Sequence, residues 1–402
     1  MHAATVAAYS LLSQASGPRV NTLLATPLTG RPQSTQGGET LTSRLAALHD
    51  SILERVPQVD RVACVLYDST DDLLKTFINS TRQGEAIAGY QFHLSESTSL
   101  SALAGSGEFR VIDNIAAAVR PDSLHSEWLL AQGYQSSFTV PMYDNDAFLG
   151  FVFFDSMLPA AFTLREQRDL LLFCSLINMA ISHEMGAVRA ILASAQIASD
   201  FARMRDFETG AHLDRMARYA RLIARDLAPR HGRTDEFVEH VYLFAPLHDI
   251  GKIGIPDRIL LKEGRLDPTE RETMQGHVDM GARIIDKILG DFGLRHLPDS
   301  TVMKNIVRQH HELLDGSGYP EGLRGDAISL EARIVTVADI FDALRSTRPY
   351  KAAWTFEDSC AELERLVAMG KLDAECVDAL HRNATQVNAI AERYRDPDPP
   401  AA

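Results

Sequence analysis

Acidic and histidine side chains recur between residues 208 and 339 in an order that suits a site for several metal ions. Two residues are spaced four apart, two pairs are adjacent, and two further residues follow singly. The set is Glu208, His212, His248, Asp249, His277, His310, His311 and Asp339. Imidazole and carboxylate ligands together suit divalent ions that attack phosphate esters. The sequence therefore predicts a hydrolase with a multi-metal centre.

The pair Glu208 and His212 is spaced i, i+4 and so shares one face of a predicted helix. The same face continues as an apolar stripe through Met216, Ala220, Ile223 and Leu227. Ionisable groups on a buried stripe are costly unless they are paired or bound to metal. A partly exposed first helical turn explains this pair equally well, so the pair alone does not decide the function.

The adjacent pair His248–Asp249 follows an apolar segment, residues 241–247, and offers one nitrogen ligand and one oxygen that can bridge two ions. A buried pair with a purely structural role is the less favoured interpretation. Lys252 lies one turn further on if the helix continues, where its ammonium group reaches a phosphate oxygen or a water. His277 on its own is a weak signal, because an exposed or capping histidine explains it as well.

The neighbours His310 and His311 leave a helix in different directions and can serve different ions. Asp339 lies in a predicted helix whose apolar sequence after Arg333 is interrupted by Thr336, Asp339 and Asp342. A buried carboxylate there requires a cation. The segment 315–325 contains four glycines and a proline, which indicates a loop that can approach a ligand closely at the rim of the site.

The elements that must position these residues are helical almost throughout from Phe201, with loops predicted at 251–265 and 315–325. An apolar-periodic stretch from Glu166 to Arg205 precedes them and predicts one long helix, opened by the capping-box pattern Thr163 to Glu166. Such a helix is a connector between domains and often forms dimers. The alternative is two ordinary packed helices with a kink.

The N-terminal part shows a mixed pattern of helix and strands. A helix is predicted at 41–54, and strands are predicted at 61–67, 74–78, 109–112, 137–143 and 147–154. The segment 143–147 reads as the turn of a hairpin. This order of elements resembles the GAF domain over residues 42–183, which implies a sensor or dimerisation module. His93 and His125 are interpreted as exposed polar residues, and no ligand is assigned to this domain.

Composition limits the class of protein. The 402 residues carry a net charge of −14, which disfavours binding to bulk nucleic acid or an anionic membrane. The four cysteines, Cys64, Cys174, Cys360 and Cys376, are scattered and indicate buried thiols in a reducing cytoplasm rather than a disulfide framework. We expect no membrane span and no secretory signal. Residues 1–40 predict a flexible leader, and 396–402 a frayed tail.

Taken together, the C-terminal motifs resemble the HD-GYP domain of the HD phosphohydrolase superfamily over residues 200–390. The motifs are 208-ETGAH-212, 248-HDIGKIGIPD-257, His277, 310-HHELLDGSGYP-320, 338-ADIFDA-343 and 348-RPYK-351. The resemblance implies hydrolysis of cyclic di-GMP to the linear dinucleotide pGpG, and on to GMP, by two or three ions of iron, with manganese as the alternative. Three ions are favoured because Glu208 stands where the trinuclear members begin the first motif.

The resemblance also implies a role for each candidate residue. Asp249 bridges two ions, with His212, His248, His277 and Asp339 as further ligands. Glu208, His310 and His311 complete the centre. Asp249 and Lys252 are the candidate catalytic residues. The candidate substrate contacts are Arg348, Lys351, Lys252, Asp342, Gly318, Tyr319 and Pro320. Arg345, Ser346 and Thr347 depart from the usual family pattern beside the phosphate-binding groups, which puts substrate affinity in question more than chemistry.

The predicted architecture is therefore multidomain. It comprises a leader (1–40), an α+β GAF-like domain with an antiparallel sheet (41–183), a connecting helix (184–206), an all-α HD-type domain (207–395) and a tail (396–402). We expect a cytoplasmic homodimer that forms through the first domain and the connecting helix, with a cyclic di-GMP synthase of the GGDEF type as a partner. Two alternatives stay open: a weakly catalytic cyclic di-GMP receptor that acts by protein binding, and a hydrolase for another nucleotide.

Overall fold

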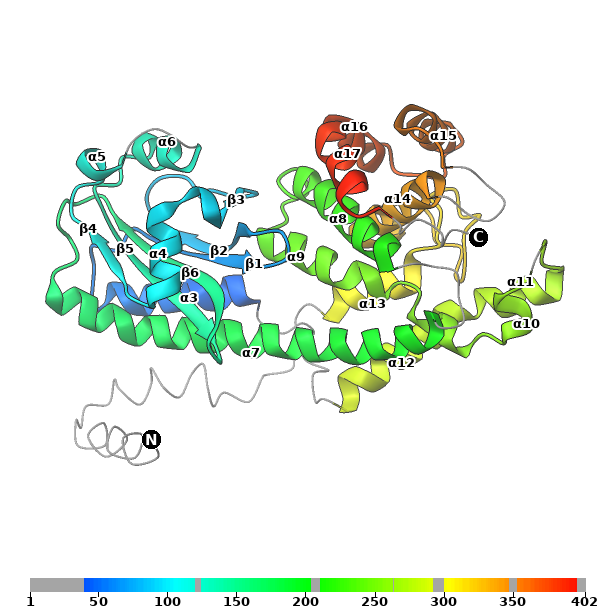
Figure 1. Cartoon of the computed structure of the whole chain (residues 1–402), viewed down its shortest axis with the longest axis horizontal. Coiled ribbons are helices and arrows are strands. Elements are labelled where there is room, and N and C mark those ends of the chain that lie inside the picture. The colour runs from blue at the N-terminus through cyan, green and yellow to red at the C-terminus, as the bar shows by residue number, and fades with distance from the viewer. Residues whose placement is uncertain are drawn as a thin grey trace, which may run out of the picture.

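A computed structural model describes residues 40–119, 124–203, 210–262, 264–291, 300–346 and 353–395. It contains a domain built on a β-sheet, a helical domain beside it, and one long helix that runs along both (Figure 1). The predicted leader, apart from Thr40, and the predicted tail lie outside the described residues. So do Glu208, Arg348 and Lys351. The predicted fold class, an α+β domain followed by an all-α domain, is confirmed.

The first domain is a six-stranded sheet in the order β3-β2-β1-β6-β5-β4, and every neighbouring pair is antiparallel. The strands are β1 (Arg61–Asp68), β2 (Leu73–Thr81), β3 (Gln91–His93), β4 (Arg110–Ile112), β5 (Ser136–Asp144) and β6 (Ala147–Ser156). The five predicted strands are confirmed, and the predicted hairpin turn carries Asn145 and Asp146 at positive φ. His93 is exposed as predicted, whereas the side chain of His125 lies outside the described residues.

Sequence reasoning missed the short elements of this domain. They are β3, the 3-10 helix η1 (Leu94–Glu96) and the helices α4 (Thr98–Ser106), α5 (Ile115–Ala118) and α6 (Leu124–Ala131). The side chains of Ser97 and Asn114 cap α4 and α5. A second apolar cluster forms on the sheet from Leu74, Leu94, Leu100, Phe151 and Phe153. Leucine and phenylalanine side chains therefore fill this part of the first domain.

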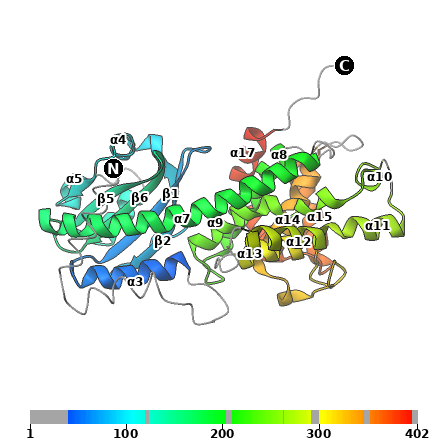
Figure 2. The ribbon, with the colours of Figure 1, turned by 90° about the horizontal axis from the view of Figure 1, so that it is seen from below.

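The connecting helix α7 (Leu164–Arg203) is a single helix of 40 residues, so the two-helix alternative is wrong for the described part. It contacts α3 (Leu41–Leu53) and β5 in the first domain and η3 (Ile250–Gly254) in the second. Figure 2 shows α7 running from the sheet domain to the helical domain. The stretch Leu164–Ser194 is long and apolar enough to cross a membrane by composition, and 39% of its most apolar window is buried. Helices that pack in the cores of soluble proteins have the same composition, so this is weak support for a membrane span.

The second domain is helical. Its α-helices are α8 (Gly210–Leu227), α9 (Asp235–Phe244), α10 (Asp257–Leu260), α11 (Pro268–Gln275), α12 (His277–Asp291), α13 (Ser300–Gln309), α14 (Leu330–Arg345), α15 (Phe356–Ala368), α16 (Ala374–Arg382) and α17 (Ala384–Arg393). Its 3-10 helices are η2 (Ala245–Leu247), η3 and η4 (Gly325–Ala327). The predicted apolar stripe of α8 is fully buried. The prediction of a loop at 251–265 is wrong, because the helices η3 and α10 occupy much of this segment.

Close packing of η3 against α12 depends on Gly251. A Cβ atom built there would lie 1.9 Å from the carbonyl oxygen of His277 and 2.4 Å from the backbone nitrogen of Gly281. Both neighbours are main-chain atoms that cannot rotate away, so a side chain would force the two segments apart. The glycine therefore sets how closely the His248–Asp249 segment approaches His277.

We predict that Gly251→Ala destabilises the helical domain by about 1–3 kcal/mol, the usual cost of overpacking. The matched control is Gly186→Ala in α7, where a Cβ atom meets nothing within 4 Å. That variant should be neutral or more stable by up to about 1 kcal/mol, because alanine is the better helix former. Urea unfolding of both variants measures the two effects, and an unchanged midpoint for Gly251→Ala would contradict this packing argument.

Candidate metal centre

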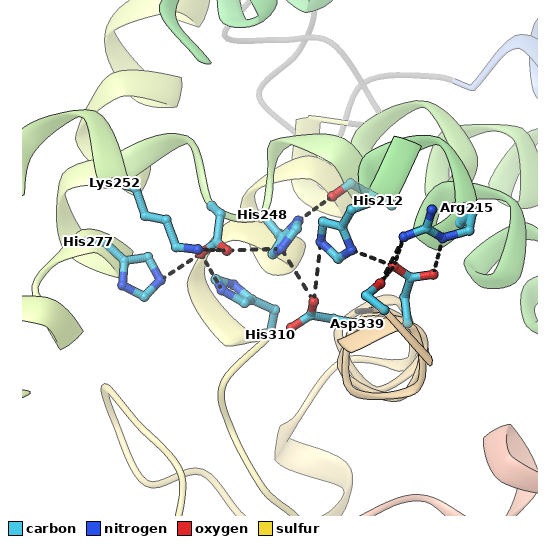
Figure 3. Close-up of polar contacts among 11 residues, drawn as sticks. His212, Arg215, His248, Lys252, His277, His310 and Asp339 are labelled. Atoms are coloured by element: carbon cyan, nitrogen blue, oxygen red, sulfur yellow. Dashed lines mark hydrogen bonds and ion pairs between the residues drawn. The ribbon is translucent and has the colours of Figure 1, made fainter. Parts of the chain in front are cut away.

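Seven of the eight predicted metal ligands lie within the described residues, and six elements bring them together. Figure 3 labels five of them, namely His212, His248, His277, His310 and Asp339. His212 comes from α8, His277 begins α12 and Asp339 lies in α14. His248 and Asp249 lie between η2 and η3, and His310 and His311 directly follow α13. Two groups of ligand atoms result, each with its atoms within 4.8 Å of one another. They are Asp249, His277, His310 and His311, and His212, His248 and Asp339.

The Nδ1 atoms of four of these histidines are held by fixed oxygen acceptors. His248 Nδ1 lies 2.9 Å from the carbonyl oxygen of Ala245, and His277 Nδ1 lies 2.7 Å from that of Met274. His310 Nδ1 lies 3.1 Å from the carbonyl oxygen of Ile306. A carbonyl only accepts, so each Nδ1 carries the hydrogen and each neutral ring presents a lone pair at Nε2. His212 Nδ1 meets a carboxylate instead, 2.7 Å from Asp342.

The Nε2 lone pairs point at carboxylate oxygens, which are acceptors too. His277 Nε2 lies 3.0 Å and His310 Nε2 lies 3.5 Å from Asp249 Oδ1, while His248 Nε2 lies 3.2 Å from Oδ2. In the second group, His212 Nε2 lies 3.7 Å from Asp339 Oδ1. Acceptors at such distances repel one another unless a cation or a proton lies between them. This donor set therefore fits divalent metal ions.

Burial disfavours protonated histidines, which are the alternative to metal ions at these short distances. It lowers the pKa of His310, and it lowers that of His311 to about 2, with the neighbouring His310 adding to the effect. Burial also disfavours the Asp249 carboxylate, but the neighbouring positive charge of Lys252 opposes burial, and the Asp249 pKa stays well below its ordinary value. Neutral imidazoles around an ionised carboxylate are the protonation states that metal ions require.

Lys252 lies where the sequence predicts it, because η3 continues the turn after Asp249. Its ammonium group lies 2.9 Å from Asp249 Oδ2. The side chains of Asp249, Lys252 and Asp339 are 13%, 19% and 23% exposed, whereas those of His248 and His277 are at most 2% exposed. The three charged side chains therefore form the open side of the cluster, and the histidines form its floor.

The assignment of Asp342 as a substrate contact is wrong. Its side chain is fully buried, and its oxygens accept hydrogen bonds from His212, from Arg215 Nε at 2.7 Å and from Ser346. Burial opposes ionisation of Asp342, but the hydrogen bonds from His212 and Arg215 outweigh it and keep its pKa below the ordinary value. Asp342 therefore lies behind His212, a candidate metal ligand. Sequence reasoning missed Arg215, although its position three residues after His212 is a usable signal.

The loop 315–325 reaches the cluster through Tyr319, whose ring stacks on that of His311 with centroids 4.6 Å apart. A Cβ atom at Gly318 would lie 2.4 Å from the backbone nitrogen of Leu313, so a glycine is needed for this close approach. The Glu312 carboxylate accepts hydrogen bonds from three backbone N–H groups of the loop, those of Glu321, Gly322 and Leu323. Within the described residues, the loop thus supports His311.

Comparison with known proteins gives the family of the helical domain. Residues 199–376 match the family model of the HD domain. A cyclic di-GMP phosphodiesterase response regulator of Xanthomonas campestris is 44% identical over 191 residues, which cover 47% of each chain. A cyclic di-GMP phosphodiesterase of Thermotoga maritima is 39% identical over 204 residues, 50% of this chain and 52% of that protein. The chain thus spans about half the length of these relatives.

Two further matches complete the comparison. A 3'3'-cGAMP-specific phosphodiesterase of Vibrio cholerae is 43% identical over 159 residues, which cover 40% of this chain and 28% of that protein. A phycocyanobilin-bound GAF domain of a cyanobacterial phytochrome aligns with 36% of this chain and 90% of that one, at 20% identity and a TM-score of 0.28. The histidine and aspartate cluster lies inside the segment matched by the family model, and residues 199–376 of this chain are an HD domain.

Proposed function

We propose that this chain is a metal-dependent phosphodiesterase that hydrolyses cyclic di-GMP to pGpG and on to GMP. The observation that carries the proposal is the set of Nε2 lone pairs around the Asp249 carboxylate, described above. The names of the relatives from Xanthomonas campestris and Thermotoga maritima support the substrate. Iron is the proposed metal, with manganese as the alternative, because mixed imidazole and carboxylate ligands suit both.

The two ligand groups support two ions. Asp249 belongs to the first group, and its Oδ2 atom lies 3.2 Å from Nε2 of His248, which belongs to the second group. This position between the groups favours Asp249 as the bridging ligand. Glu208, the proposed ligand of a third ion, lies outside the described residues. Divalent ions supply a nucleophile by lowering the pKa of water and stabilise negative charge on a phosphate. We propose three ions, with Glu208, His310 and His311 completing the centre.

The side chains at the open face have distinct proposed tasks. Asp249 and Asp339 hold the cluster together from the side that solvent reaches. Lys252 places a positive charge at the same side, where a phosphodiester oxygen would meet it. Arg348 and Lys351, outside the described residues, are proposed to bind the second phosphate. Gly318, Tyr319 and Pro320 are proposed to border the substrate on the side of His311.

Asp249→Asn should lower turnover of cyclic di-GMP by more than about 100-fold, beyond the range typical of residues that only orient a ligand. The amide keeps the shape of the side chain but removes the charge that holds the cations, so metal content should fall as well. Turnover is measured by chromatography of the products and metal by mass spectrometry, on protein purified without oxygen. The matched control is Asp291→Asn on the exposed end of α12, which should behave as wild type. Full activity of Asp249→Asn would refute the assignment.

A second substrate is favoured by one observation, the match to a 3'3'-cGAMP-specific phosphodiesterase. We predict that cyclic di-GMP is preferred over 3'3'-cGAMP by about tenfold or more in kcat/KM. Guanine and adenine differ in hydrogen-bonding groups, and a site that pairs with one rejects the other strongly. Parallel assays of both dinucleotides measure the ratio, and a ratio below one would assign the chain to the second substrate. Binding without any product would favour a receptor instead.

We also propose a cytoplasmic homodimer that forms through the first domain and α7, with a GGDEF-type cyclic di-GMP synthase as a partner. Large apolar side chains on α7 stay exposed at Leu164, Leu172 and Met179, and the last two are one heptad apart. Leu172→Glu combined with Met179→Glu should convert the dimer to a monomer, because buried charges would face each other across the helix pair. Light scattering after size-exclusion chromatography measures the mass. An unchanged dimer would exclude this face of α7.

A further inference from the structure

The two domains meet through buried charged groups. The turn between β1 and β2 inserts Asp71, only 8% exposed, into the helical domain. Its Oδ2 accepts a hydrogen bond of 3.1 Å from Arg218 Nε of α8, and its Oδ1 lies 3.2 Å from Arg393 Nη2. The hydroxyl of Tyr394 donates to Oδ1 as well. A buried carboxylate is tolerated only with such partners, so Asp71 ties the first domain to one small region of the second.

That region lies directly behind the metal centre. Arg215 forms a two-pronged contact with Asp342, with Nε 2.7 Å from Oδ1 and Nη2 2.9 Å from Oδ2. Asp342 Oδ2 accepts the Nδ1 hydrogen of His212, which turns the Nε2 of His212 toward Asp339 (Figure 3). A carboxylate that accepts from the far nitrogen of a ligating histidine fixes its tautomer and orientation. Arg215 in turn fixes the carboxylate.

Tyr394 joins the two sets of contacts. Its main-chain oxygen accepts a hydrogen bond of 2.8 Å from Arg215 Nη1. Its ring lies under the Arg218 guanidinium, 3.9 Å from Cζ to the ring centroid, while its hydroxyl binds Asp71. One residue thus contacts the first domain through its side chain and the Arg215–Asp342 pair through its backbone.

We propose that Arg215 and Tyr394 are positioning residues for His212, and that Asp71 of the first domain holds them in place, so that docking of the first domain sets metal affinity at the His212 group. The proposal rests on the metal-dependent function proposed above. The spacing on α8 supports it, because His212, Arg215 and Arg218 follow at intervals of three and lie along one side of the helix. A state with the first domain undocked would lose Asp71 and free the C-terminal end of α17.

The test compares two buried carboxylates at the same domain interface. Asp71→Asn removes the charge that Tyr394 and Arg218 bind. The matched control is Glu239→Gln, which removes the charge that Lys75 of the first domain binds at 2.8 Å but has no described contact with Arg215 or Asp342. Both variants are made in the full chain, and Mn²⁺ affinity of the metal-free protein is measured by calorimetry and by the electron paramagnetic resonance of free Mn²⁺. Circular dichroism checks that each variant is folded.

Asp71→Asn should weaken Mn²⁺ binding by about 2- to 30-fold, the range of mutations that change coupling between distant sites. Glu239→Gln should leave it within twofold of wild type. Tyr394→Phe, which removes only the hydroxyl, should weaken binding in the same direction, and the double variant with Asp71→Asn should be no weaker than Asp71→Asn alone. In turnover assays, kcat at subsaturating Mn²⁺ should fall with little change in KM.

Equal Mn²⁺ affinity of Asp71→Asn and wild type would overturn the proposal, and so would an equal loss in Glu239→Gln, which would reduce the effect to general loosening of the interface. A wild-type chain that binds no Mn²⁺ or Fe²⁺ would also overturn it. The proposed function fails separately: a chain that binds Mn²⁺ and shows the predicted ranking, but hydrolyses neither dinucleotide, would keep the positioning role and refute the phosphodiesterase.

Discussion

The architecture of the helical domain depends on an electrostatic conflict at Asp249. Backbone carbonyls fix the hydrogen of each surrounding ring on Nδ1, so neutral imidazoles turn their lone pairs toward a carboxylate. Nothing in that arrangement is favourable without positive charge. Lys252 supplies one charge from the side, and the remaining repulsion suits the cluster to binding a cation. The close approach of η3 and α12, which only a glycine at position 251 allows, brings His277 into this set.

Helix α14 contributes to the rest of the candidate metal centre through three polar residues. Thr336, Asp339 and Asp342 are spaced three apart and so form one line on the apolar stretch of α14 between Arg333 and Arg345. The hydroxyl of Thr336 donates to the main-chain oxygen of His310 at 2.7 Å. Asp339 reaches the open side of the cluster, and Asp342 holds His212 from behind. One helix face therefore fixes the backbone of one proposed ligand, supplies a second and orients a third.

Much of this could be predicted from the sequence, because it depends on local patterns. Short apolar and aromatic runs between turns predicted the strands, and an uninterrupted apolar period predicted α7. Ionisable residues on or directly after apolar segments predicted His212, His248 and Asp339 as candidate ligands. The role of Asp342 could not be predicted, since a buried carboxylate facing substrate and one facing a histidine leave the same trace in the sequence. The prediction of a loop at 251–265 was wrong because Gly251 permits close packing of the 3-10 helix η3 and Pro256 directly precedes the helix α10.

Contacts between the two domains were beyond sequence reasoning. Asp71 and Arg218 are 147 positions apart, and neither belongs to a motif. Yet the chemistry of that interface differs from an apolar one in a way that matters for regulation. A buried charged group is tolerated only beside its partner, so a partial separation that breaks an ion pair but keeps water out leaves a costly unpaired charge. The ion pairs of Asp71 with Arg218 and of Lys75 with Glu239 therefore disfavour partly separated arrangements of the two domains. Full docking pairs these charges, and full undocking returns them to water. Such a two-state element is the physical requirement for a sensor domain to control a distant metal ligand.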